Sequence, residues 1–414
     1  MKVCHVTDAL PGRHRIWGGA EQGCLRIVEA CGAAGLEVCV AATRQTAPGS
    51  EGPAFHEVPV WETYFNRPLI WRYKLIKDFF LPFDPLAFFS SFLLFRREKP
   101  DIVHLHRVNA ISFAPAIAAR LLGIPTVLSV YDYWLLCPGM VLPPAGAAAG
   151  CKGYHGAWCR GCPVSPAGYL SSLLRRRLFH IFLGRINAFH ALSASSRGVL
   201  ARYGIDAGKI NVIPIPPPPP DAVESAPVKK DRILFSGWIE PRKGAEMIVK
   251  AMPEILAAFP DAELVVLGGV TDPAYMEKLR GYIAGADIEG RVHFKGKVTA
   301  EEAASYLRGA QVVAIAEQWE NMSPIVLIEA MAQGKPVVAG DIGGMNEFIE
   351  DGRTGVLVKY DSPAAYGEAI KRLLGDSAKA GEMGLNAQKR IKFMCAPEKI
   401  AGRLLEMYSG LSRQ

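Results

Sequence analysis

Short apolar runs alternate with longer amphipathic stretches along the whole chain. Residues 124–130 and 312–316 are largely apolar, as strands buried on both faces of a parallel sheet are. Between such runs, apolar positions recur at helical spacing, as in 245–259. Further strands are predicted at 2–7, 38–40, 100–106, 232–236, 264–267, 292–294 and 337–339. The alternation predicts an α/β fold with two Rossmann-like parallel-sheet domains facing across a cleft.

A proline run at 216–220 divides the two series of strands. Polyproline is a stiff spacer, so we expect a linker at 214–230 between domains at 1–213 and 231–395. A last helix in 396–414 is compatible with packing on either domain, the N-terminal one included.

The stretch 317–358 is predicted to form a loop, a helix, a strand and a second loop. We expect Ser323 to cap the helix and Pro324 to occupy its first position. A helix N-terminus favours phosphate or an electron-rich oxygen, and the carboxylate of Glu329 in the second turn suits sugar hydroxyls. These features indicate a nucleotide-sugar site. The alternative is an ordinary strand–helix unit with a solvated glutamate.

Two features of the N-terminal half lie where a parallel sheet binds ligands. Gly18 and Gly19 open a helix after the first strand, where they either let a ligand approach the backbone or form a plain tight turn. They lack the spaced three-glycine dinucleotide pattern. His106 ends the strand 100–106 and is placed to reach a ligand, although a structural histidine is the alternative.

Aromatic and cationic side chains interleave in residues 61–96, and a second basic helix is predicted at 171–192. This pattern suits a segment that lies on an anionic membrane surface. A buried pair of helices with a basic rim is the alternative.

A loop at 137–162 contains four cysteines, two of them as Cys-x2-Cys. Such a set is typical of a structural zinc site, with His155 able to replace one ligand. Unligated thiols are the alternative. The four candidate ligands are Cys137, Cys151, Cys159 and Cys162.

Composition narrows the function classes. The chain has 414 residues, a formal net charge of +7 and 21% charged residues, and no long arginine or lysine run, so nucleic acid is not expected as a partner. No apolar leader follows Lys2 and no run of about 18 apolar residues occurs. Nine cysteines without an export signal indicate reduced thiols or a metal site. We expect a cytoplasmic protein, peripheral on the inner face of the cell membrane.

The motifs, taken in order, resemble the retaining nucleotide-sugar glycosyltransferases of family 4, which have the GT-B fold. The resemblance covers nearly the whole chain. It rests on Gly-Gly-Ala-Glu at 18–21, Pro-Asp-Ile-Val-His-Leu-His at 100–106, Asp-Tyr-Trp-Leu-Leu-Cys-Pro at 132–138, Lys-Gly at 243–244, Glu-Ala-Met-Ala-x-Gly-x-Pro-Val-Val at 329–338, Gly-Gly-Met-Asn-Glu at 343–347 and Asp-Gly-Arg-Thr-Gly at 351–355.

The resemblance implies an acceptor-side N-terminal domain and a donor-binding C-terminal domain. It implies that Lys243, beside Arg242, neutralises the donor diphosphate and that Glu329 holds the ribose. The loop 320–324 would hold the donor sugar, and Gly18 and Gly19 would let donor and acceptor approach. The implied catalytic residues are Glu320, Asn321 and His106; the implied donor-binding residues are Gly18, Gly19, Arg242, Lys243, Met322, Ser323, Pro324, Ile325 and Glu329.

Three positions depart from the family pattern. Asn321 stands where the first of two glutamates is usual, with Glu320 one residue further out; Trp238 replaces an arginine, and Tyr131 replaces a histidine. No Asp-x-Asp pair occurs, so we expect no catalytic cofactor and metal-independent departure of the diphosphate.

We therefore expect transfer of a sugar from a nucleoside-diphosphate sugar to a saccharide or lipid-linked acceptor with retention, in cell-surface polysaccharide or glycolipid synthesis. The alternatives are a nucleotide-sugar epimerase of the same fold and a non-catalytic binding or scaffold protein.

Overall fold

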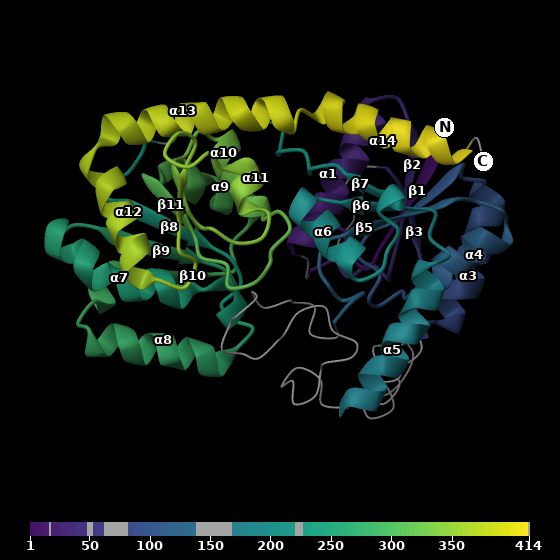
Figure 1. Ribbon diagram of the computed structural model, residues 1–414, viewed down its shortest axis with the longest axis horizontal. Coiled ribbons are helices and arrows are strands. Elements are labelled where there is room, and N and C mark those ends of the chain that lie inside the picture. Colours follow the sequence, from purple (N-terminus) through teal and green to yellow (C-terminus); the bar gives the residue numbers. More distant parts are fainter. Residues whose placement is uncertain (16–17, 48–52, 62–81, 138–167, 220–226, 413–414) are drawn as a thin grey trace. The chain divides into compact units, whose positions relative to one another are not determined.

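The computed structural model describes residues 1–15, 18–47, 53–61, 82–137, 168–219 and 227–412, with the side chains of 168–175 left out. The chain divides into two compact units (Figure 1). The N-terminal unit contains Met1–Pro216 and Pro397–Gln414, and the C-terminal unit contains Pro217–Ala396. The terminal helix is therefore part of the N-terminal unit.

A seven-stranded parallel sheet forms the centre of the N-terminal unit, in the order β3-β2-β1-β4-β5-β6-β7. Its middle strands are short and wholly buried because both faces are covered. The strands are β1 (Lys2–Thr7), β2 (Glu37–Ala42), β3 (Ala54–Glu57), β4 (Ile102–Leu105), β5 (Thr126–Val130), β6 (Ala188–Ala191) and β7 (Ile210–Val212).

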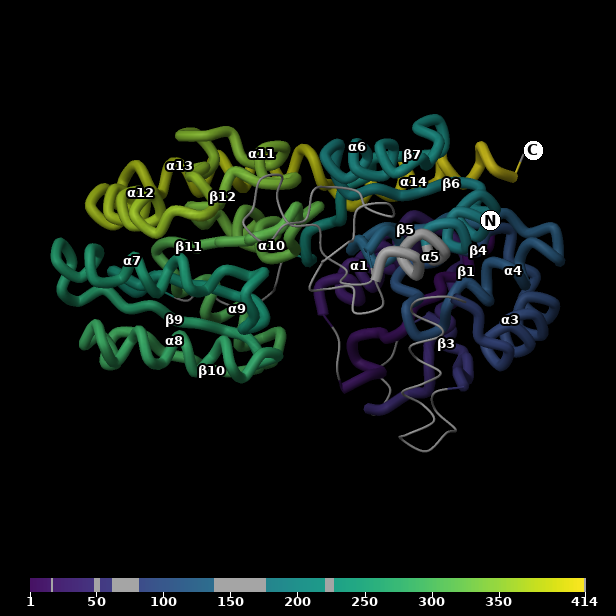
Figure 2. Tube along the Cα trace, turned by 60° about the horizontal axis from the view of Figure 1, so that its bottom comes forward, coloured from purple at the N-terminus to yellow at the C-terminus, as the bar shows by residue number. Residues whose placement is uncertain are grey.

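The helices of this unit are α1 (Gly19–Ala33), α3 (Pro85–Glu98), α4 (Ala114–Leu121), α5 (Gly168–Leu183), α6 (Ala194–Arg202) and α14 (Pro397–Ser412). Figure 2 shows α14 running beside α1, and both bury apolar side chains against the sheet. The helix predicted at 171–192 is wrong at its C-terminal end. The chain leaves α5 at Leu183, and 188–191 form β6, where Phe189 and its neighbours are buried.

Local sequence explains where α3 begins and ends. The Asp84 carboxylate accepts the backbone N–H groups of Leu86 and Ala87, and Pro85 occupies the first turn, where its missing N–H costs nothing. Lys99 ends the helix in the left-handed conformation. The helix has a fixed start even though the residues before it, 62–81, lie outside the described part of the chain.

The C-terminal unit has a six-stranded parallel sheet in the order β10-β9-β8-β11-β12-β13. Its strands are β8 (Arg232–Ser236), β9 (Glu263–Leu267), β10 (Val292–Gly296), β11 (Val312–Ile315), β12 (Val337–Gly340) and β13 (Val356–Val358). Its helices are α7 (Ala245–Ala258), α8 (Pro273–Gly285), α9 (Ala300–Gly309), α10 (Ile325–Ala332), α11 (Met345–Phe348), α12 (Pro363–Gly375) and α13 (Ser377–Met394). Aliphatic side chains of the strands and of α7, α8 and α12 form its core.

The two parallel α/β sheets confirm the predicted fold class. Among the described residues, no helix is both long enough and apolar enough to cross a membrane.

Candidate functional site

Three loops of the C-terminal unit meet because the strands before them are neighbours. β8, β11 and β12 lie side by side, and all run in the same direction. Their carboxyl ends give rise to the loops 237–244, 316–324 and 341–344. Ligands of open parallel sheets bind beyond this edge, which makes the three loops the first place to look for a site.

Glycine lets these loops approach one another closely. Gly244 has a φ of +71°, and a Cβ there would lie 1.8 Å from the carbonyl oxygen of Ala316 in the next loop. Gly343 has a φ of +60°, and its Cβ would lie 2.2 Å from the carbonyl oxygen of Asn321. Both positions therefore need the left-handed backbone and the missing side chain of glycine.

The cations predicted in the first loop are held by acidic partners. Lys243 Nζ lies 2.7 Å from Glu317 Oε1, and the indole Nε1 of Trp319 donates a hydrogen bond to the other carboxylate oxygen. Arg242 pairs with Glu240 at 2.6 Å, and the Arg242 guanidinium also lies over the Trp319 ring. Glu317 is buried, so this carboxylate fixes the ammonium group of Lys243 in one position.

Sequence reasoning did not assign a role to Glu317. A signal was available, because the residues that follow adjacent strands meet at one edge, and Glu317 follows β11 just as Lys243 follows β8. An acidic residue at that point is the natural partner for a lysine in the neighbouring loop.

The N-terminus of α10 differs from the prediction. The N-cap is Pro324 and the helix begins at Ile325, so the predictions that Ser323 caps the helix and that Pro324 is its first residue are wrong. The helical hydrogen bonds begin at the carbonyl of Pro324, which accepts the N–H groups of Leu327 and Ile328, so Ser323 lies one residue before the cap. Asn321 Oδ1 accepts the backbone N–H of Ser323 at 3.2 Å in the loop before the helix. The Ser323 hydroxyl is buried and makes no hydrogen bond within the described structure.

The other predicted residues of this half surround the same helix start. Met322 is buried, and Glu320 and Ile325 are half-buried. Glu329 is half-buried in the second turn of α10. Because α10 has no side-chain cap, its first N–H groups and the Ser323 hydroxyl present donors at one place.

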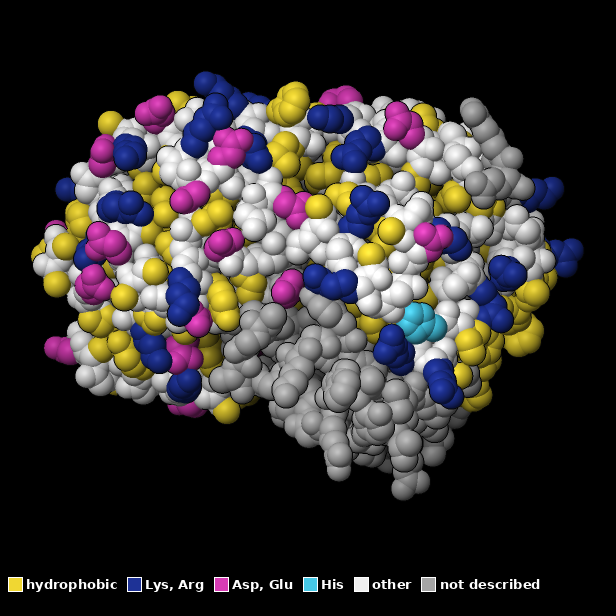
Figure 3. Space-filling model, viewed as in Figure 1, with side chains coloured by type: hydrophobic (Ala, Val, Ile, Leu, Met, Phe, Trp, Pro, Cys, Tyr) yellow, Lys and Arg dark blue, Asp and Glu magenta, His cyan; other side chains and the backbone are white. Residues whose placement is uncertain are grey.

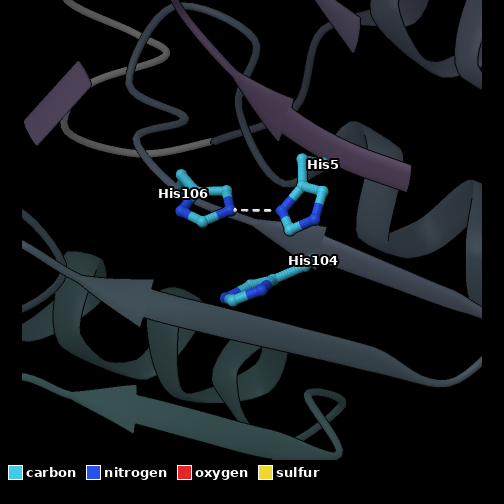
Figure 4. A group of neighbouring side chains, drawn as sticks. All are labelled: His5, His104 and His106. Carbon is cyan, nitrogen blue, oxygen red and sulfur yellow. Dashed lines mark hydrogen bonds between the residues drawn. The ribbon is translucent and has the colours of Figure 1, made fainter. Parts of the chain in front are cut away.

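His106, in the N-terminal unit, belongs to a buried group of histidines (Figure 4). His106 Nε2 lies 2.9 Å from Nδ1 of His5, and His106 Nδ1 lies 2.9 Å from the Tyr131 hydroxyl. His104 stacks on His106 with ring centroids 4.1 Å apart. Burial lowers the pKa of all three rings, that of His5 to about 3, so they are neutral at physiological pH. Both nitrogens of His106 are already in hydrogen bonds.

A second chain of hydrogen bonds in this network has a defined direction. His190 Nε2 must donate to the carbonyl of Ile213, so its Nδ1 accepts from the hydroxyl of Ser129. The oxygen of Ser129 then accepts from His104 Nε2, which leaves His104 Nδ1 to accept from Tyr408 of α14. One carbonyl thus determines the tautomers of two histidines and links the terminal helix to the sheet.

Within the described chain, His5, His104 and His106 are the group whose ligand atoms, within 4.8 Å of one another, are close enough for a metal ion. However, His104 uses both nitrogens in hydrogen bonds, and its ring stacks on His106. Ring-nitrogen lone pairs lie in the ring plane, so stacked rings do not direct them to a common point. The geometry is that of a hydrogen-bonded network.

Gly18 and Gly19 begin α1 as predicted, and the glutamate that follows them has structural partners. Glu21 accepts the backbone N–H of Gly18 at 2.8 Å and pairs with Arg107 at 2.9 Å. Nearby, the carboxylate of Asp8 accepts backbone N–H groups after β4, and burial raises its pKa to about 6. A small pocket beside them has His106, Arg107, Asn109, Tyr131, Asp132 and Trp134 among its lining residues.

Three of the candidate zinc ligands, Cys151, Cys159 and Cys162, lie outside the described residues, as does His155. Cys137 is buried. The zinc site stays a prediction.

Two family models match this chain, one in each half. The family model "Glycosyltransferase Family 4" matches residues 17–216, and the model "Glycosyl transferases group 1" matches residues 221–390. The chain belongs to the family 4 glycosyltransferases. The suspected family is confirmed, and with it the GT-B architecture of two parallel-sheet domains.

Known glycosyltransferases resemble this chain over different spans. The D-inositol 3-phosphate glycosyltransferase of Kineococcus radiotolerans is 31% identical over 48% of this chain and 51% of its own length. The putative glycosyltransferase YtcC of Bacillus subtilis is 28% identical over 44% of this chain and 46% of its own. The chain spans about half the length of the curated relatives it matches.

Solved structures share the fold at low sequence identity. Anabaena HepE, crystallised with UDP and glucose, matches with a TM-score of 0.70 and 17% identity over 99% of this chain and 100% of its own. Sucrose-phosphate synthase from Thermosynechococcus elongatus matches with a TM-score of 0.72 and 20% identity over 99% of this chain and 98% of its own.

Proposed function

We propose that this chain is a retaining glycosyltransferase that moves a sugar from a nucleoside-diphosphate sugar to a saccharide or lipid-linked acceptor. The observation that carries the proposal is the edge of the C-terminal sheet. There, Lys243 and the uncapped start of α10 come from loops after neighbouring strands, and a carboxylate, Glu329, follows one turn later.

The chemistry follows from charge. When the glycosidic bond to the donor breaks, negative charge develops on the departing diphosphate, and Lys243 and the N–H groups of α10 would stabilise it without a metal. Arg242 lies beside Lys243 and adds a second cation. The Ser323 hydroxyl, which has no partner within the described structure, would donate to the same group.

The remaining roles rest on the family resemblance. Glu329 would accept the ribose hydroxyls, and Met322, Pro324 and Ile325 would line the donor. Glu320 and Asn321 would bind the transferred sugar, with Asn321 also holding the loop through its bond to Ser323. Attack from the face of the departing diphosphate would retain the configuration without a carboxylate nucleophile.

The acceptor side belongs to the N-terminal unit in this proposal. Gly18, Gly19 and the pocket beside His106 would form it, with His106 acting from inside its hydrogen-bonded network. The protein would work in the cytoplasm, on the inner face of the cell membrane, in cell-surface polysaccharide or glycolipid synthesis. A structural zinc bound by the cysteine loop would be its only metal.

Names of related proteins suggest which substrates to try first. HepE was crystallised with UDP-glucose, so UDP-sugars are the first donors. Several relatives are named D-inositol 3-phosphate glycosyltransferases, so a phosphorylated polyol belongs in the acceptor panel beside saccharides and lipid-linked sugars.

A donor panel tests the proposal. UDP-, GDP-, ADP- and dTDP-sugars are screened for thermal stabilisation and for slow hydrolysis. The variants are Lys243→Ala and Glu329→Ala, and the controls are Lys278→Ala and Glu368→Ala, whose side chains are exposed in the same unit. We expect one donor base to stabilise and turn over, with both effects lost in the first pair and kept in the controls.

Each contrary outcome points to a different function. A donor that stabilises the protein but is not turned over, whichever acceptor is added, would favour a non-catalytic binding protein. Interconversion of the donor sugar without transfer would favour an epimerase. No response to any donor would overturn the proposed site.

A further inference from the structure

Helix α3 presents large apolar side chains to solvent. Phe89 is 63% exposed and Leu93 66%, and Leu86 is 37% exposed on the same stripe, at helical spacings of three and four residues. On the neighbouring helix α4, Leu121 is 65% exposed. Scattered apolar side chains are normal on a protein surface, but a continuous stripe along one helix marks an interaction site.

The stripe is additional to the face that α3 packs inward. Ala87, Leu94 and Phe95 are buried on that face and hold the helix in the unit. A helix that serves only the core needs one apolar side, with polar residues on the other. In α3 the outer side is also apolar over its first turns, and packing among the described residues does not account for these side chains.

Basic residues border this stripe. Arg96 and Arg97 occupy the last turn of α3 and Lys99 follows it, and all three are exposed. Arg120 on α4, also exposed, precedes Leu121. Figure 3 shows dark blue basic side chains among yellow hydrophobic ones at the edge where Figure 1 places α3 and α4.

The acidic residues of α3 offset only part of this charge. Asp84 is fully buried and caps the helix. Glu98 is engaged by Lys2 at 3.0 Å and by Arg97 at 2.9 Å. The outer face therefore carries apolar side chains and a net positive border, which we call the α3 face: Leu86, Phe89, Leu93, Arg96, Arg97, Arg120 and Leu121.

We propose that the α3 face docks on an anionic lipid surface. Phenylalanine and leucine side chains on a helix that lies flat reach the boundary between headgroups and acyl chains, while arginines remain at the level of the phosphates. The positive border is complementary to an anionic membrane. Docking of this kind requires no spanning helix. It rests on the membrane location proposed above and deepens it by naming the surface that makes the contact, and it does not depend on which sugar the enzyme transfers.

Sedimentation of the full chain with lipid vesicles tests this surface. Vesicles of phosphatidylcholine alone are compared with vesicles that also contain phosphatidylglycerol, at low and at high salt. One variant removes the apolar stripe (Leu86→Ser, Phe89→Ser, Leu93→Ser) and another removes charge (Arg96→Gln, Arg97→Gln). The control, Leu385→Ser with Phe393→Ser on α13, removes apolar side chains that are similarly exposed, at 58% and 74%, in the other unit.

We expect binding to the anionic vesicles that weakens at high salt. The stripe variant should bind at least about tenfold more weakly, and the charge variant should lose roughly fivefold per arginine at low salt. The control should bind like the unmodified protein. All variants are first checked for an unchanged melting temperature, because the changed side chains are exposed.

Several results would overturn the proposal. Absence of vesicle binding is one, and equal binding by the stripe variant and the control is another. A concentration-dependent dimer that only the stripe variant abolishes would assign the face to a second copy of the chain. A large fall in melting temperature in the stripe variant alone would mean that other parts of the chain cover the face.

Discussion

The two parallel sheets of this protein share an architecture but differ in what they bury. In the N-terminal unit, the strands β1, β4, β5 and β6 place His5, His104, Ser129 and His190 in one polar row across the sheet. In the C-terminal unit, the equivalent strands bury aliphatic side chains. Of the nine histidines in the chain, His293 alone falls in the C-terminal unit.

The candidate sites at the two sheet edges differ in the same way. The site of the N-terminal unit is built from buried titratable side chains such as Glu21 and His106. That of the C-terminal unit depends on backbone approach, because Gly244 and Gly343 bring three loops into direct contact. We infer that the first unit is sensitive to pH and the second to changes in its glycines.

Lowering the pH should produce the largest difference in stability between the two units. Burial lowers the pKa of His5 to about 3 and of His190 to about 4, from 6.5. The unfolded chain therefore binds protons below pH 6.5 that the folded unit does not, and stability is lost as the pH falls. Each of these histidines should lower the free energy of unfolding of the N-terminal unit by about 2 kcal/mol at about pH 5. Hydrogen exchange, corrected for intrinsic rates, should show β1, β4, β5 and β6 losing protection first.

Loss of protection in β8, β9, β11 and β12 at the same pH as in the first sheet would contradict the greater acid sensitivity of the N-terminal unit.

Alanine at Gly244 should strongly destabilise the C-terminal unit. The left-handed backbone strains any Cβ, and this one would also collide with the carbonyl oxygen of Ala316. We expect a loss of about 3 kcal/mol or more in the free energy of unfolding. Gly352→Ala is the matched control, because Gly352 has a φ of +73° and no atom within 4 Å of the added Cβ. It should lose only about 1 kcal/mol in urea unfolding. Equal losses would show that contact between the loops does not matter.

Removing the partner of Lys243 should have a smaller effect. Glu317→Gln leaves the ammonium group without its carboxylate in a largely buried place, although the 19% exposure of Lys243 lets water compensate. We expect a loss of about 1–2 kcal/mol. Glu368→Gln, in an exposed pair with Lys371, should lose much less stability in the same urea titration, because water screens the pair. If the two variants lose the same free energy of unfolding, the Lys243–Glu317 pair contributes no more to stability than an exposed ion pair does.

Asp8 should have the smallest effect on the pH dependence of stability, with a sign opposite to that of the histidines. Burial raises its pKa to about 6 from 3.8, so the folded unit binds a proton that the unfolded chain releases, and Asp8 adds stability as the pH falls through about 6. Asp8→Asn should therefore increase the acid loss of the N-terminal unit between about pH 7 and pH 5 by about 1 kcal/mol. A shallower acid loss in this variant would contradict the sign.

The alternation of apolar runs was enough to predict most strands of both sheets, because fully buried parallel strands leave a clear pattern in sequence. The edge strands β3 and β13 were not predicted. Strand 2–7 has its predicted bounds, and the final helix lies within the predicted segment 396–414. The end of α5 was missed although Gly184 follows Leu183 directly and Arg185 and Asn187 interrupt the apolar run before β6. A glycine after the last helical turn is a common stop signal, so the sequence did mark this end.

Candidate residues could be named from single loops, but the contacts made where loops meet could not. Lys243, Ser323 and Glu329 were named as candidates from local motifs and from the family resemblance. The pairing of Lys243 with Glu317 depends on β8 and β11 being neighbours, and the row of histidines depends on the order of four strands. The cap of α10 was misjudged because the helical hydrogen bonds begin at the carbonyl of Pro324, one residue after Ser323.

The central claim is that the donor binds the C-terminal unit at the start of α10. Hydrogen exchange with and without the stabilising nucleotide sugar tests it most directly, because exchange reports each backbone N–H. We predict new protection at 237–244 and 320–329, and its loss in Lys243→Ala. Protection confined to the N-terminal unit, or protection that Lys243→Ala leaves intact, would contradict the account.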